Sequence, residues 1–220
     1  MQTIYFSPPW FFGYDISLEF LFAIMSLVVS LFAFHLYRVS GERQTKLFGV
    51  AFLTISISYF LQSIFNFLIV GKLSQDVCRI IKVQDAAVFE ALGIYAQIIF
   101  MTAGLVLLTY MTLKTEKPAV YWLMLSIALI GTLASRNVLY VFYLISALLL
   151  IFLCWHFFDN YAKRKHAKTL FVALAFLFLL IRDIQFVLSL DYEIFYVLGR
   201  LAELTAYVLL AINFYLVRRR

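Results

Sequence analysis

Apolar segments close to 20 residues long recur along the whole chain and are separated by short polar connections. A helix of about 20 apolar residues crosses the roughly 30 Å hydrocarbon core of a bilayer. The composition agrees with this reading: 65% of the residues are hydrophobic and 14% are charged, against about 45–50% and about 25% in soluble domains. The sequence therefore predicts an all-α, polytopic membrane protein.

Seven spans are expected, and the connections between them are too short to hold a soluble domain, so residues 1–220 form a single predicted transmembrane domain. The fourth span is the shortest. The N-terminal segment lacks a basic region and a small-residue cleavage site, so we do not expect a removable signal peptide there. The predicted spans cover residues 16–37, 47–70, 87–113, 119–135, 137–158, 169–190 and 193–217.

Lysine and arginine are distributed unevenly between the two sets of connections, and this bias predicts the orientation. Four lie on one side, at Lys72, Arg79, Lys82 and Arg136. Twelve lie on the other, at Arg38, Arg43, Lys46, Lys114, Lys117, Lys163, Arg164, Lys165, Lys168, Arg218, Arg219 and Arg220. The N-terminus is therefore expected outside and the C-terminus in the cytoplasm, in a protein of the plasma membrane. Basic residues in this pattern indicate topology and not a nucleic-acid partner.

The first three spans can be aligned with the last three. When Leu47 is placed on Leu170, Gln62 falls on Gln185. A second block, "LGIYAQ" on "LGRLAE", places Gln97 on Glu203. Polar residues are scarce in the spans, so these matches favour an internal repeat of residues 16–113 and 137–217, joined by a linker helix at 119–135.

A three-plus-one-plus-three order of helices resembles the architecture of the PQ-loop and sugar-transporter class of seven-helix proteins, and more loosely the rhodopsin-like bundles. The resemblance implies only the fold. The chain contains no Pro-Gln dipeptide, and its seventh span has no lysine that could form a retinal Schiff base. The sequence therefore does not assign the chain to a family.

Polar side chains inside the spans fall on particular helix faces. A charge in the hydrocarbon core is unfavourable by roughly 2.5–3.5 kcal/mol on insertion scales, so such faces should turn toward other helices. The seventh span carries its polar residues at steps of four, three and four positions, at Tyr196, Arg200, Glu203 and Tyr207. The full set of candidate site residues is Arg182, Asp183, Gln185, Arg200, Glu203, Glu90, Gln97, Gln62, Asn66 and Glu19.

Most of these candidates fall in the expected outer half of the bundle, which predicts a polar pocket or network that opens outward. Arg182 and Asp183 are adjacent, so they point about 100° apart on their helix. We expect them to meet different neighbours, with Arg200 and Glu203 as the favoured partners. Three interpretations remain open: a structural network that fixes packing, a site with arginine anchors for a small polar or anionic ligand, and proton or ion translocation through Glu203 and Asp183.

No motif for a metal, a catalytic nucleophile or a cofactor occurs in the sequence, so we do not expect an enzyme. His35 and His156 lie near the expected cytoplasmic ends of spans one and five and are interpreted as interfacial residues, not haem ligands. The leading hypothesis is a receptor-like membrane sensor. Alternatives are a small-solute or proton-coupled transporter built from a three-helix repeat, and a structural scaffold or accessory subunit. Expected partners are the lipid bilayer, a small polar ligand and a cytoplasmic or membrane protein.

Overall fold

Seven helices and no strand make up the part of the chain that the structure, a computed structural model, describes: residues 11–73, 83–115, 117–165, 167–189 and 192–218. One helix covers each of the seven predicted segments, which confirms the all-α fold class. The helices are α1 (Phe12–Ser40), α2 (Arg43–Leu73), α3 (Val83–Thr112), α4 (Pro118–Leu133), α5 (Val138–Arg164), α6 (Ala167–Leu188) and α7 (Ile194–Arg218).

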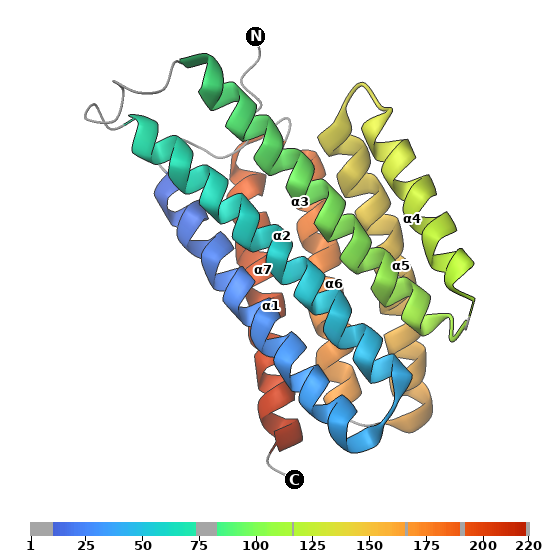
Figure 1. Ribbon diagram of the computed structural model, residues 1–220. Coiled ribbons are helices and arrows are strands. Elements are labelled where there is room, and N and C mark those ends of the chain that lie inside the picture. The colour runs from blue at the N-terminus through green and yellow to red at the C-terminus, as the bar shows by residue number, and fades with distance from the viewer. Residues whose placement is uncertain (1–10, 74–82, 116, 166, 190–191, 219–220) are drawn as a thin grey trace.

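Six of these helices are long and apolar enough to cross a membrane, and α4 is a shorter apolar helix. With 16 residues, α4 is about 24 Å long, less than the roughly 30 Å of a bilayer core. It nevertheless runs back along the bundle from the end of α3 to the start of α5 (Figure 1). The protein is therefore a multi-pass helical membrane bundle, and its predicted orientation remains a prediction.

The helices form two sequential units. In the N-terminal unit α1 packs on α2 and α2 on α3, and in the C-terminal unit α5 packs on α6 and α6 on α7 (Figure 1). The units meet where α1 packs on α7 and α3 on α5, while α4 lies against α3 and α5. The pairing of the six helices other than α4 is unchanged when α1, α2 and α3 are exchanged with α5, α6 and α7, and the contacts of α4 do not follow this exchange. A three-helix repeat would produce such a pattern, although the repeat itself stays a prediction.

Small residues and hydroxyl groups hold the N-terminal unit together. Ser56 Oγ donates to the carbonyl of Ala23 at 2.7 Å, and Ser30 Oγ donates to that of Gly49 at 2.8 Å. These bonds join α2 to α1. Close backbone approach and interhelical hydrogen bonds are the means by which helices associate in lipid, where apolar burial provides little driving force.

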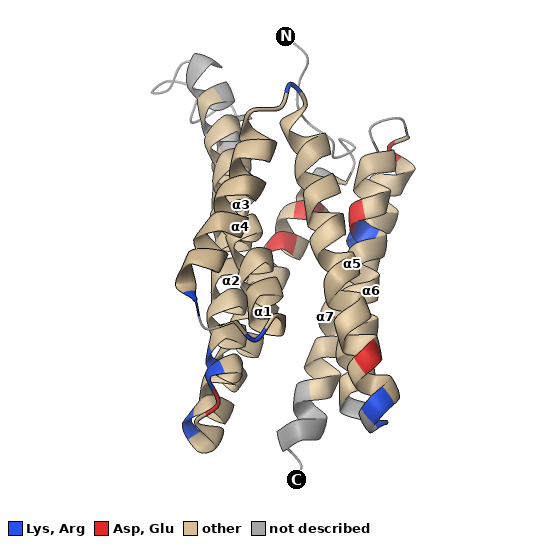
Figure 2. Ribbon diagram, turned by 90° about the vertical axis from the view of Figure 1, so that its right-hand side faces the viewer, with Lys and Arg blue, Asp and Glu red and all other residues tan. Residues whose placement is uncertain are grey.

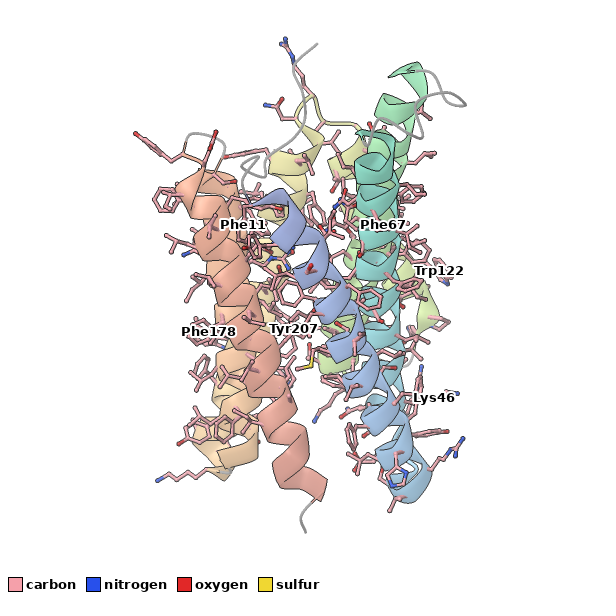
Figure 3. All side chains as sticks on the ribbon, turned by 90° about the vertical axis from the view of Figure 1, so that its left-hand side faces the viewer. Phe11, Lys46, Phe67, Trp122, Phe178 and Tyr207 are labelled. Carbon is pink, nitrogen blue, oxygen red and sulfur yellow. The ribbon has the colours of Figure 1, made fainter. Side chains whose placement is uncertain are left out.

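The outer surface of the bundle is apolar, as contact with lipid requires. Trp122 is 64% exposed and Trp155 is 77% exposed, and side chains project from the helices around the bundle (Figure 3). Inside, Phe22, Tyr59 and Tyr207 pack with ring centroids 5.2–6.0 Å apart. This aromatic cluster joins α1, α2 and α7.

Candidate functional site

Six charged side chains from α1, α6 and α7 are buried together. Even the most exposed of them, Arg200, is only 4% exposed. In Figure 2, acidic and basic positions occur along the helices inside the bundle, in the half nearer the end marked N than the end marked C. We call the six buried side chains the charge network: Asp15, Glu19, Arg182, Asp183, Arg200 and Glu203.

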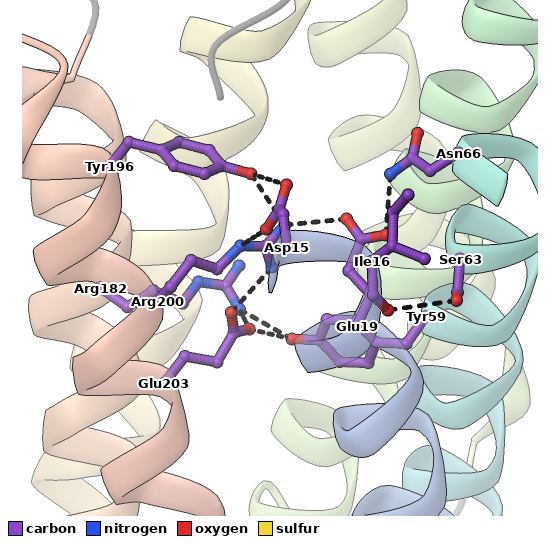
Figure 4. Close-up of polar contacts among 10 residues, drawn as sticks. All are labelled: Asp15, Ile16, Glu19, Tyr59, Ser63, Asn66, Arg182, Tyr196, Arg200 and Glu203. Atoms are coloured by element: carbon purple, nitrogen blue, oxygen red, sulfur yellow. Dashed lines mark hydrogen bonds and ion pairs between the residues drawn. The ribbon is translucent and has the colours of Figure 1, made fainter. Parts of the chain in front are cut away.

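Arg200, on α7, pairs with two carboxylates of α1. Its Nε lies 2.6 Å from Asp15 Oδ1 and its Nη2 lies 2.8 Å from Glu19 Oε1 (Figure 4). Its Nη1 lies 3.0 Å from Glu203 Oε2, one turn along α7. Since α1 and α7 belong to different units, this single guanidinium links the two halves of the bundle.

Arg182, on α6, pairs with Glu203 of α7, as the sequence predicts, with 2.6 Å between Nη1 and Oε1. Its Nη1 also donates to Tyr59 Oη of α2 at 3.0 Å, and Tyr59 donates in turn to Glu203. Asp183 differs from the expectation. It pairs with its own neighbour, because Arg182 Nε bends back to within 3.0 Å of Asp183 Oδ1.

Polar and aromatic neighbours surround the network. Asn66 Nδ2 donates to Glu19 Oε2 at 2.8 Å, and Tyr196 Oη donates to Asp15 Oδ2 at 2.6 Å. The ring of Phe186 lies against both guanidinium groups, 5.2 Å from Arg182 and 5.5 Å from Arg200, measured from Cζ to the ring centroid. These distances are within the range of cation–π attraction, which strengthens when the groups are desolvated.

The network contains four carboxyl groups and two guanidinium groups, so full ionisation would leave two negative charges in excess. Burying an unpaired ion in a protein costs several kcal/mol even after relaxation. The arrangement therefore favours the uptake of protons or of a cationic group. No set of three or more His, Cys, Asp or Glu side chains suited to a metal ion occurs among the described residues.

The structure brings six of the ten predicted site residues together: Glu19, Asn66, Arg182, Asp183, Arg200 and Glu203. Gln62 and Gln185 are half-buried, and the Oε1 of each lacks a hydrogen-bond partner in the described structure. Gln97 does not join the network in the described structure: its backbone carbonyl accepts from Ser58 Oγ at 3.1 Å, which links α3 to α2. The side chain of Glu90 lies outside the described residues.

Asp15 is the main residue that the predicted set omits. It precedes Glu19 by four positions and so shares its helix face, which is a signal that the sequence contained. It lies one residue before the first predicted span, which begins at residue 16, and so was not counted among the intramembrane residues. Tyr59 and Tyr196 were also outside the set. Helix spacing placed Tyr196 on the polar face of the seventh span, but in a chain with 14 tyrosines spacing alone does not separate a network tyrosine from a packing one.

Comparisons of the chain with protein-family models, curated proteins and solved structures gave no match.

Proposed function

We propose that the protein is a seven-helix membrane sensor of the receptor-like kind, in which a small ligand acts on the charge network between the two units. One observation carries the proposal: Arg200 of the C-terminal unit is paired with both Asp15 and Glu19 of the N-terminal unit. A ligand that competes for these carboxylates weakens the link between α1 and α7. Binding energy is thereby converted into a movement of one unit against the other.

The charges of the network favour a cationic ligand over the anionic one considered from the sequence. Both guanidinium groups already face carboxylates, so an anion would have to displace Glu203 or Glu19 and add to a negative excess. A primary ammonium group would instead bring the network closer to neutrality. The neighbouring rings of Phe186 and Tyr196, which already contact Arg200, would stabilise such a cation.

Signal output in this proposal uses a partner on the proposed cytoplasmic side. The basic segments at 159–168 and 218–220 are the proposed docking site for a cytoplasmic or membrane protein. The same residues suit the anionic lipid headgroups of that leaflet of the plasma membrane.

The test measures the separation of the two units in nanodiscs. Spin labels are attached at Ser40→Cys on α1 and Lys163→Cys on α5, both exposed positions, with Cys78→Ser and Cys154→Ala in the background. Small alkylammonium ions are titrated against carboxylate ions of matched size. The proposal expects the alkylammonium ions to change the distance distribution measured by electron–electron double resonance, and the carboxylates to leave it unchanged.

Two variants provide the comparison. Glu19→Gln removes one of the paired carboxylates and should abolish the response to alkylammonium ions. Asp159→Asn removes an exposed carboxylate that pairs with Lys163 and lies outside the network. For this control the second label is placed at Lys165→Cys, and the variant should respond like the parent that carries the same two labels. An unchanged distance with every ammonium ion, or equal responses from the parent and Glu19→Gln, contradicts the proposal.

A proton-coupled transporter of small solutes is the second candidate, and it is favoured by the excess of carboxyl groups at the junction of two similarly arranged units. Reconstituted liposomes with an internal pH indicator test it. Proton flux that depends on an added solute and disappears in Glu203→Gln supports transport over sensing.

A structural role, as in a scaffold or accessory subunit, is tested by the double variant Arg182→Met with Asp183→Leu. If this variant is at least as stable as the parent and fully active, the network is structural.

A further inference from the structure

Asp183 has the fewest donors of the four carboxyl groups in the charge network. Glu203 receives contacts from Arg182, Arg200 and Tyr59, and the two carboxyls of α1 each receive two donors. Asp183 has the ion pair with Arg182 Nε at 3.0 Å. Its side chain is fully buried, and its Oδ2 has no hydrogen-bond partner in the described structure.

A second unpartnered polar group lies beside Asp183. Ser146 of α5 is 2% exposed, and its Oγ lacks a formed hydrogen bond in the described structure. The ionisable and polar groups that act on Asp183 are Arg182 on its own helix, Tyr143 and Ser146 from α5, and Glu203 from α7. Arg182 is thus the cation that faces the Asp183 carboxyl, and Glu203 competes with Asp183 for Arg182.

Protonation changes what this carboxyl can do. An ionised carboxylate only accepts hydrogen bonds, whereas a protonated carboxyl also donates one. Ser146 Oγ can accept a hydrogen bond donated from a protonated Oδ2, and its hydroxyl can instead donate to the ionised carboxylate. Both forms can therefore use this contact, and the charge balance of the network decides between them. A proton on Asp183 removes one of the two excess negative charges and leaves Arg182 paired with Glu203.

We propose that Asp183 is a proton-binding site of the network and is held as a neutral acid that donates from Oδ2 to Ser146 across the contact of α5 and α6. Hydronium from the solvent supplies the proton: one of its O–H bonds breaks, an O–H bond forms at Asp183 Oδ2, and a water molecule is released. The inference deepens the proposed function, on which it rests for its role, because it makes the proton a ligand of the same network.

The test is infrared difference spectroscopy of the protein in nanodiscs, with the side-chain carboxyl carbon of aspartate labelled with ¹³C. The proposal expects a protonated aspartic acid band at neutral pH, where exposed aspartates are ionised. Asp183→Asn should remove this band, and Ser146→Ala should move its frequency without removing it. Asp15→Asn, within the network, and Asp159→Asn, on the surface, serve as matched controls and should leave the band in place.

Absence of the band at neutral pH in the parent overturns the proposal, and so does its survival in Asp183→Asn. Because an amide resembles the neutral acid, Asp183→Asn should keep the thermal unfolding midpoint of the parent, and a marked drop also counts against a neutral Asp183. The infrared band can behave as expected while alkylammonium ions leave the distance between the spin labels unchanged. That combination rejects the cation-sensing proposal and supports the proton site.

Discussion

At the scale of single residues, the charge network contains more acidic groups than basic groups. Arg200 contacts three carboxyl groups, and each of those three has at least one further donor. Neutralising an acidic residue lowers the negative excess, and neutralising an arginine raises it. The two kinds of substitution should therefore differ strongly in their effect on stability, although both remove one charge from the same buried place.

Arg200→Gln should lower the free energy of unfolding by about 3–5 kcal/mol, as is typical when one partner of a buried ion pair is removed. In Glu19→Gln the amide oxygen still accepts from Arg200, and the amide of Asn66 can turn so that its oxygen accepts from the new NH2 group. The loss should therefore stay at about 1 kcal/mol. Unfolding in mixed micelles measures both, with the exposed Lys163→Gln as a control expected within ~0.5 kcal/mol of the parent. Equal losses for Arg200→Gln and Glu19→Gln would argue against an acid-rich network.

Helix spacing carried much of the information about individual residues. It placed Tyr196, Arg200, Glu203 and Tyr207 on one inward face, and all four are buried. It could not reveal Ser146, because the pairing of a serine with an acid on another helix depends on how the helices pack. It also overstated the separation of Arg182 and Asp183, since a flexible arginine side chain can fold back onto its neighbour.

At the scale of helices, the predicted spans marked the apolar segments but not the helix ends. α1 and α2 extend beyond their spans at both ends, whereas α4 and α6 end two residues before theirs. The fifth span was predicted at 137–158, yet α5 continues to Arg164. The additional turn contains the Lys163–Asp159 pair at i,i+4, which supports an exposed helix. It ends at Lys165, whose left-handed backbone, with φ of 49°, closes the helix. Hydrophobicity locates the membrane core and not the end of the helix.

Gly104 provides a test of close packing between α2 and α3. A Cβ at this position would lie 2.6 Å from Ile55 Cγ1 and 3.1 Å from the carbonyl oxygen of Ala51. Because a backbone atom cannot move aside easily, Gly104→Ala should destabilise the protein by about 1–3 kcal/mol. Gly131→Ala on α4 would meet its nearest atom at 3.5 Å and should be neutral or slightly stabilising. Thermal unfolding in detergent compares the two, and a harmless Gly104→Ala would contradict this packing.

At the scale of the whole molecule, the number of helices followed from the sequence, but their pairing did not. Contacts of α1 with α7 and of α3 with α5 join residues far apart in the chain, and apolar surfaces facing lipid or protein look alike in composition. The polar matches between the two sets of spans gave the only clue to a repeated arrangement, and those matches do not specify which helices meet.

The orientation predicts which connections an impermeant reagent reaches. Arg136→Cys, between α4 and α5, should react with a membrane-impermeant maleimide in intact cells, because this connection is expected outside. Lys163→Cys, near the end of α5, should react only after permeabilisation. Both variants are made with Cys78→Ser and Cys154→Ala. The reverse pattern of labelling would invert the predicted topology.

The link between the two units through the charge network is most directly tested by a double-mutant cycle on Glu19 and Arg200, whose atoms are 2.8 Å apart across α1 and α7. The free energy of unfolding in mixed micelles is measured for the parent, Glu19→Gln, Arg200→Gln and the double variant. The account predicts a coupling energy of about 1–3 kcal/mol, as for residues in one buried network. Additive effects within ~0.5 kcal/mol would show that this ion pair does not join the two halves of the protein.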